Sequence, residues 1–144
     1  MAKTVKIPYS LDEGAFKPEK AHTADAGFDL RTPVYRMMKP NNSIVVDTGV
    51  HMYIPEGYCG LLVSKSGLNV KNSITGTGLI DAGYTGSIVV KLYSDNNDFL
   101  TFNKGDKIIQ IIILPVPEVE LTEVATETAP ETERGDNGFG STGK

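Results

Sequence analysis

The chain of 144 residues lacks tryptophan, has one cysteine and two histidines, and contains no long apolar run. Because Cys59 is alone, no intramolecular disulfide can form, and we interpret it as a small core residue. The N-terminus lacks the apolar segment of a signal peptide, and no run reaches the ~18 residues of a membrane-spanning helix. The net charge of −4 provides no overall field that attracts nucleic acid or anionic lipid. We therefore expect a cytoplasmic protein that binds neither nucleic acid nor membrane.

Glycine and proline, in contrast, are frequent: fifteen glycines and eight prolines divide the chain into short segments. No segment keeps a helical period over three turns, and the best helix candidate is one turn near Ser66–Lys71. The pattern predicts an all-β sandwich or jelly roll. The runs typical of strands are Thr4–Pro8, Ser43–Asp47, Val50–Ile54, Tyr58–Val63, Ser87–Tyr93, Phe99–Phe102 and Lys107–Leu114.

The segment Lys107–Leu114 has isoleucine at five of its eight positions, so both faces of this strand are apolar. Such a strand must be covered on both sides, either within the core or at a subunit interface. Beyond it, Glu118–Leu121 is compatible with an edge strand, and the acidic Thr122–Glu133 is typical of a mobile arm. The glycine-rich Arg134–Lys144 carries one arginine and one phenylalanine, which fits a disordered tail or a lid that orders on a ligand.

Three glycine-containing segments are candidates for phosphate binding. Gly76–Gly78 and Gly140–Lys144 lack the following helix that a dinucleotide fold or a P-loop requires, so we reject both. Ser64–Leu68 directly follows the run Tyr58–Val63, and its hydroxyls, ammonium and backbone amides can converge on one anion. A simple polar turn is the alternative for this segment.

Two carboxylates stand between apolar neighbours, where an acidic side chain is a poor strand residue. Asp81 lies in an expected hairpin, and the alternative is that it starts the bend before Gly83. Asp29 lies within Asp25–Leu30, beside another strand. His22 and His51 fit no metal-ligand or triad spacing, so we expect only surface or packing roles for them.

Taken together, five ordered segments resemble the motifs of the trimeric dUTPase family, over nearly the whole chain. The resemblance implies a distorted jelly-roll body over residues 1–117 and a flexible C-terminal arm with an active-site lid over 118–144. It also implies a homotrimer whose active sites are shared between subunits. The five segments are Asp25–Leu30, Ser64–Leu68, Gly78–Gly86, Lys104–Gln110 and Arg134–Gly143.

The same resemblance implies a reaction: dUTP is hydrolysed to dUMP and pyrophosphate by water attack on the α-phosphorus, with Mg²⁺ as cofactor. Asp81 would be the general base, and Asp29 would hold the metal through a water molecule. Uracil would bind backbone groups around Leu79, Ile80 and Val89. The other residues that the resemblance places on the substrate are Lys65, Ser66, Gly67 and Gln110 at the phosphates, Tyr84 under the deoxyribose, and Arg134, Phe139, Gly140, Ser141 and Thr142 in the lid.

Two positions depart from the family pattern. Lys65 stands where the family usually has arginine, so a bidentate phosphate clamp is lost. Thr75 stands where the family usually has asparagine, and its hydroxyl cannot replace the paired donor and acceptor of an amide toward uracil. The alternatives to a dUTPase are a dCTP deaminase of related fold, which needs a glutamate near the base and no phenylalanine lid, and a nucleotide-gated binding module.

Overall fold

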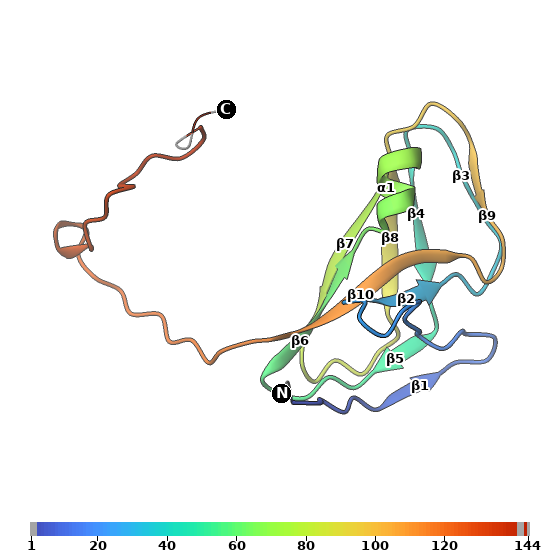
Figure 1. Ribbon diagram of the computed structural model, residues 1–144, viewed down its shortest axis with the longest axis horizontal. Coiled ribbons are helices and arrows are strands. Elements are labelled where there is room, and N and C mark those ends of the chain that lie inside the picture. The colour runs from blue at the N-terminus through green and yellow to red at the C-terminus, as the bar shows by residue number, and fades with distance from the viewer. Residues whose placement is uncertain (1–2, 141–142, 144) are drawn as a thin grey trace.

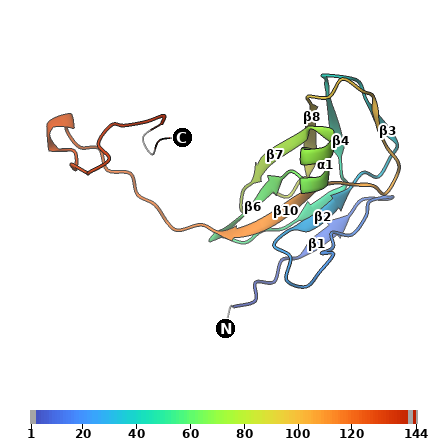
Figure 2. The ribbon, with the colours of Figure 1, turned by 45° about the horizontal axis from the view of Figure 1, so that its top comes forward.

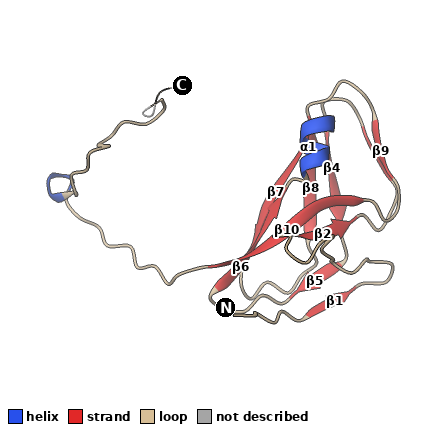
Figure 3. Ribbon diagram, viewed as in Figure 1, coloured by secondary structure: helices blue, strands red, loops and turns tan. Residues whose placement is uncertain are grey.

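A computed structural model of the chain describes residues 3–140 and 143. Strands dominate this part of the chain, so the all-β prediction is confirmed (Figure 3). The expected helical turn is helix α1 (Ser66–Asn72). The strands are β1 (Tyr9–Leu11), β2 (Phe28–Arg31), β3 (Arg36–Met38), β4 (Ser43–Asp47), β5 (Val50–Met52), β6 (Tyr58–Val63), β7 (Ile74–Ile80), β8 (Val89–Ser94), β9 (Leu100–Phe102) and β10 (Lys107–Pro115), and a 3₁₀ turn, η1, covers Thr126–Thr128.

Six strands form one curled antiparallel sheet in the order β2-β10-β6-β7-β8-β4 (Figure 1). Two smaller pairs, β1–β5 and β3–β9, extend from it, and α1 packs against β7 near its start, where Asn69 lies beside Thr75. The sheet curls because successive strands twist in one sense, and β4 and β8 thereby lie across the core from β10. The strands that continue into the candidate site, β6, β7 and β8, lie side by side in this sheet.

The isoleucine-rich strand β10 lies between β2 and β6, where it has a strand on each side. Ile108, Ile109 and Ile111 are at most 1% exposed, so for these three residues the core explains the apolar pattern. Each buried side chain of this size contributes about 1.5–3 kcal/mol of transfer free energy. Ile112 and Ile113 are only half-buried and leave apolar surface available on the chain.

The C-terminal segment leaves the body after β10 (Figures 1 and 2). Val116 donates its amide to the Gly57 carbonyl at 2.8 Å, and the hydrogen bonds of the described residues beyond it are local. Glu118–Leu121 has no partner strand in the described chain, and the first strand begins at Tyr9, so the strand predicted over Thr4–Pro8 is wrong. No helix in residues 3–140 has the length and apolar character needed to cross a membrane.

Candidate active site

The hairpin formed by β7 and β8 opens into a mouth toward its turn. The two strands pair only from Ile74 to Gly76, with Gly76 opposite Leu92. Beyond this point Thr77–Ile80 pairs with β6, and the facing part of β8 pairs with β4 (Figure 1). In the described chain, therefore, no strand occupies the space between Thr77–Ile80 and the start of β8. The backbone groups that line this mouth are available to a ligand.

Gly76 stands at the point where the strands diverge. A Cβ added there would lie 2.9 Å from Ile109 Cδ1 and 2.9 Å from Leu92 Cδ2, with the Lys91 carbonyl at 3.3 Å. Real Cβ atoms essentially never approach that closely, so an alanine there would force the end of the Ile109 or Leu92 side chain to shift. The last residue of β7 that pairs with β8 is therefore one whose small size the core packing uses.

Asp81 directly follows β7 at the end of this mouth, and its side chain is exposed. It also starts the turn, since Tyr84 donates its amide to the Asp81 carbonyl at 3.3 Å and Gly83 has φ +85°. The turn role therefore uses the main chain and leaves the carboxylate exposed. The Tyr84 hydroxyl donates to the Ser87 carbonyl at 2.8 Å and holds the ring across the loop. Around the mouth Leu79, Tyr84 and Val89 are 60%, 45% and 47% exposed.

The segment Lys65–Gly67 forms a second group of candidate residues, at the start of α1. Gln110 donates its side-chain amide to the Ser64 carbonyl at 3.1 Å, and the Ser64 hydroxyl accepts the Gly76 amide at 3.0 Å. These bonds fix the segment to β10 and β7. Ser66 and Gly67 are exposed, and a Cβ at Gly67 would meet open space.

Asp29 lies next to this segment and is 5% exposed, paired in register with Gln110 across β2 and β10. Its carboxylate forms ion pairs with Lys65 and with Lys107, whose Nζ lies 3.3 Å from Oδ2. A buried carboxylate without partners is strongly disfavoured, and the two ammonium groups satisfy it. The contact of Lys107 with Asp29 was not predicted, although Lys107 lies within the fourth motif-like segment.

The chain itself does not build a metal cage. In residues 3–140, no three His, Cys, Asp or Glu side chains are grouped closely enough to hold an ion. Asp29 does fit a water-mediated contact, because a carboxylate has about four lone-pair positions and two ammonium groups use only part of them. Mg²⁺ keeps several of its waters and commonly binds with substrate phosphates, so one such contact suits this ion.

The two groups of candidate residues lie at opposite ends of β7. Ser64 is hydrogen-bonded to Gly76, and Asp81 is five residues further along an extended chain. At about 3.3 Å per residue, the separation is about 17 Å. A general base must lie within about 3 Å of the atom that it deprotonates. Asp81 therefore lies far from Gly76, the residue that holds Ser64 and the Lys65–Gly67 segment after it, compared with this reach.

The remaining candidates are also apart from the mouth. Thr75 is exposed on β7 opposite Tyr93, and its hydroxyl lies 3.4 Å from the Asn69 amide nitrogen. Arg134 donates to the Asn137 carbonyl at 3.1 Å, a local contact within the arm, and Phe139 is fully exposed. Gly140 has φ +78°, which a residue with a side chain rarely adopts. The expected lid residues Ser141 and Thr142 lie outside the described residues.

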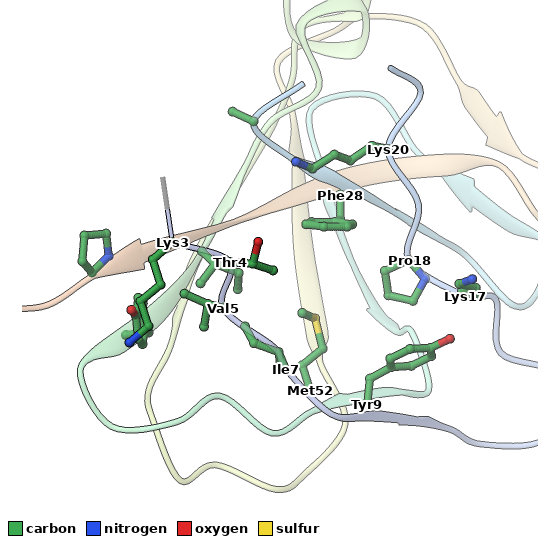
Figure 4. A pocket seen from close by; sticks show the side chains of 14 residues that line it. Lys3, Thr4, Val5, Ile7, Tyr9, Lys17, Pro18, Lys20, Phe28 and Met52 are labelled. Atoms are coloured by element: carbon green, nitrogen blue, oxygen red, sulfur yellow. The ribbon is translucent and has the colours of Figure 1, made fainter. Parts of the chain in front are cut away.

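A cavity of about 830 Å³ lies away from the candidate site. It lies between the N-terminal segment and the edge of the sheet, where Phe28 and Ile113 form part of an apolar lining (Figure 4). Lys20 places its Nζ over the Phe28 ring, 4.9 Å from the centroid. A smaller hollow of about 570 Å³ is lined by Asp81, by the turn that leads into β6 at Tyr58, and by the start of the arm.

His51 makes two polar contacts beside the loop of Asp81, although we expected only a surface or packing role. Its Nδ1 lies 2.8 Å from the Thr85 carbonyl, and its Nε2 lies 2.9 Å from Asp12 Oδ1. The Thr85 carbonyl, followed by the Asp12 carboxylate, raises the pKa of His51 above its ordinary value. No spacing in the sequence indicates these contacts, because they join three segments that are distant along the chain.

The open hairpin ends at an acid, and a polar segment is fixed to the neighbouring strands. This arrangement in an all-β protein is suited to binding a base in the hairpin and an anion at the polar segment. Comparison with known proteins identifies the family. The dUTPase family model matches residues 15–143, and the chain belongs to this family.

Its relatives include a deoxyuridine 5'-triphosphate nucleotidohydrolase of Tropheryma whipplei, strain Twist, 38% identical over 138 residues and covering 93% of each chain. A solved structure of a mutant Staphylococcus bacteriophage 80alpha dUTPase with dUpNHpp matches with a TM-score of 0.88 at 31% identity, covering 98% of this chain and all of the other. A mutant dUTPase of S. aureus phage phi11, with a structural Mg(II) ion, matches with a TM-score of 0.77 at 30% identity, over 83% and 97% of the chains. These matches confirm the family and the fold class predicted from the sequence.

Proposed function

We propose that this protein is a dUTP pyrophosphatase, which hydrolyses dUTP to dUMP and pyrophosphate. The observation that carries the proposal is the open mouth between β7 and β8 with Asp81 at its end, in a chain of the dUTPase family. A relative is named deoxyuridine 5'-triphosphate nucleotidohydrolase, and a similar structure contains dUpNHpp, an analogue of dUTP. The reaction would limit uracil in DNA and supply dUMP for dTMP synthesis.

Uracil would enter the hairpin mouth and bind backbone groups around Leu79, Ile80 and Val89. Strand backbones present a fixed order of donors and acceptors, and the exocyclic amine of cytosine reverses one position of that order. An unpaired buried group costs about 1–3 kcal/mol, which is a tenfold to hundredfold preference for uracil. Tyr84, held by its hydrogen bond to Ser87, would pack against the deoxyribose and exclude a 2′-hydroxyl.

Asp81 would accept a proton from the attacking water, because its carboxylate is exposed beside the mouth. The water oxygen forms a bond to the α-phosphorus, and the bond from that phosphorus to the bridging oxygen of the β-phosphate breaks. The electron pair of the broken bond leaves with pyrophosphate. The products are dUMP and pyrophosphate, and the proton remains on Asp81 until solvent removes it.

The segment Lys65–Gly67 would hold the phosphates, with Gln110 positioning it through the Ser64 carbonyl. Lys65 supplies a point charge, since a lysine has no planar fork for two parallel bonds. Asp29 would accept a hydrogen bond from a metal-bound water. Mg²⁺, when bound with the triphosphate, would neutralise the charge that develops on the leaving group.

We further propose that the active site is shared between the subunits of a homotrimer. The separation of about 17 Å along β7 between Asp81 and Gly76, which holds the segment before Lys65, supports this, because the base and the phosphate contacts of one chain lie far apart. The exposed arm also supports it, since the Phe139 ring is fully exposed on it. Under this proposal residues 118–144 form the arm and lid, in which Phe139 would stack on uracil and Arg134 would pair with phosphate, with Gly140, Ser141 and Thr142 covering the phosphates.

The proposal is tested by measuring pyrophosphate release from dUTP, dTTP, dCTP and UTP. We expect turnover of dUTP alone, and Asp81→Asn is expected to reduce it by about 10²–10⁴-fold while dUTP still binds. Asp98→Asn removes another exposed carboxylate and serves as the matched control with unchanged turnover. Conversion of dCTP to dUTP would instead identify a deaminase, and binding of dUTP without turnover would identify a binding module. A cytoplasmic location, consistent with the single cysteine, is proposed with this function.

A further inference from the structure

The loop between β7 and β8 is attached to the β5 segment at three places. Gly83 donates its amide to the Ile54 carbonyl at 3.2 Å, and Ile88 donates to the Val50 carbonyl at 2.8 Å. Between these two main-chain bonds lies the contact of the His51 ring with the Thr85 carbonyl at 2.8 Å. Just before β5, the Thr48 hydroxyl also donates to the Ile88 carbonyl at 2.6 Å, so within β5 His51 supplies the side-chain hydrogen bond to this loop among the described residues. The His51 ring therefore contacts the loop between these two bonds, at Thr85, four residues after Asp81.

The ring of His51 meets an acceptor at each nitrogen. Nδ1 faces the Thr85 carbonyl, and Nε2 faces the Asp12 carboxylate at 2.9 Å. Neither oxygen can donate a hydrogen, so both nitrogens must carry one for both bonds to form. Only the imidazolium has two N–H groups. A neutral ring keeps one bond and turns a lone pair toward the other oxygen.

We propose that His51 is a positioning residue for hydrolysis: as an imidazolium it ties the turn at Asp12 to the loop that carries Asp81 and Tyr84. The inference rests on the proposed function, because the loop matters for turnover only if Asp81 acts on the nucleotide. Asp12 lies just after β1, which pairs with β5 through Ser10 opposite His51. The imidazolium thus connects the catalytic loop to a segment outside the main sheet.

Three groups decide the protonation of His51. The Thr85 carbonyl and the Asp12 carboxylate stabilise the imidazolium directly, and the Asp47 carboxylate at the end of β4 adds a smaller attraction. Together they raise the pKa of the ring above its ordinary value, against the desolvation that lowers it. With the pKa raised, the imidazolium persists further into the neutral range and is lost as the pH rises through the raised value. The geometry of the loop then depends on pH in this window.

The test compares kcat and KM for dUTP across about pH 5.5–9 with the imidazole titration of His51 followed by NMR. The variants are His51→Gln and Asp12→Asn, and His22→Gln is the matched control, since His22 lies outside this loop. We expect His51→Gln to lower kcat by about threefold to tenfold at the acid end, because a loosened loop misplaces the base. We also expect kcat of the wild-type protein to fall as the pH rises through the pKa of His51, and kcat of His51→Gln to lack this fall.

Asp12→Asn is the decisive variant, because it retains an acceptor and removes the charge. The pKa of His51 measured by NMR and the inflection in kcat should fall together by the same amount. If the NMR pKa moves and the kcat profile does not, His51 has no positioning role. Wild-type kcat and profile in His51→Gln would overturn the proposal equally. Failure of the wild-type protein to release pyrophosphate at any pH would refute the proposed function itself, a distinct outcome.

Discussion

Mixing two inactive variants tests whether one active site takes residues from different chains. The first variant is Asp81→Asn, which lacks the base and keeps the phosphate segment. The second is the double variant Lys65→Ala, Ser66→Ala, which keeps the base and lacks phosphate contacts. Each is expected to be inactive alone, and the separation of about 17 Å along β7 predicts that they complement each other.

The expected recovery follows from random assembly of equal amounts of the two chains. A given site takes Asp81 from a chain of the double variant with probability one half. It takes the Lys65–Gly67 segment of the adjacent subunit from an Asp81→Asn chain with the same probability. About one quarter of all sites are then complete, and the activity per site should reach about one quarter of wild type.

The assay is pyrophosphate release after the two chains are unfolded together and refolded, so that subunits mix. As a control, wild type refolded with an equal amount of Asp81→Asn should retain about half of its activity per site, since one residue decides each site. The same two variants refolded separately and combined afterwards should remain inactive until subunits exchange. A co-refolded mixture with no more activity than its parents would show that each site lies in one chain, and it would refute the distance argument.

Three further outcomes are expected. Gly76→Ala should lower the free energy of unfolding by about 1–3 kcal/mol in urea titrations, because its Cβ would lie 2.9 Å from Ile109 and Leu92; an unchanged midpoint would contradict the packing. A chelator should abolish dUTP hydrolysis yet leave Tm in the absence of nucleotide unchanged, since Asp29 is satisfied by two lysines; a marked fall in Tm would indicate a structural ion. The stabilisation from protonated His51 should be complete below about pH 6.5 and decline as the pH rises through its raised pKa. The difference in urea midpoint between wild type and His51→Gln should therefore shrink over that pH range. A difference that stays constant would refute the linkage.

Much of the fold could be predicted from local patterns. The strand Ser43–Asp47 alternates apolar and polar residues, and Tyr58–Val63 lies between turn signals, so both have the predicted bounds. The strand β3 (Arg36–Met38) was missed, because three residues between turns carry too little period to be recognised. Thr4–Pro8 has the composition of a strand but no partner in the described chain, because β5 pairs with Tyr9–Leu11 instead.

The candidate site was predicted as a set of residues, and its arrangement was not. Local sequence indicates that Asp81 and Asp29 are unusual acids, but not that Asp29 is buried between two lysines. The Lys65–Asp29 ion pair and the contacts of His51 join segments 34 to 39 residues apart, and a periodic pattern in the sequence cannot indicate contacts at such separations. The separation of Asp81 from Lys65–Gly67 likewise depends on strand register, which the composition of each segment leaves open.

Gly76 couples the two halves of the site within each chain. On one side its amide binds the Ser64 hydroxyl and so fixes the segment that leads to Lys65. On the other side it is the last residue of β7 that pairs with β8, so the mouth begins directly after it. A Cβ at this position would push against core side chains that support both strands. A substitution there should therefore disturb nucleoside binding at one active site and phosphate binding at the neighbouring one, although the residue itself touches neither ligand.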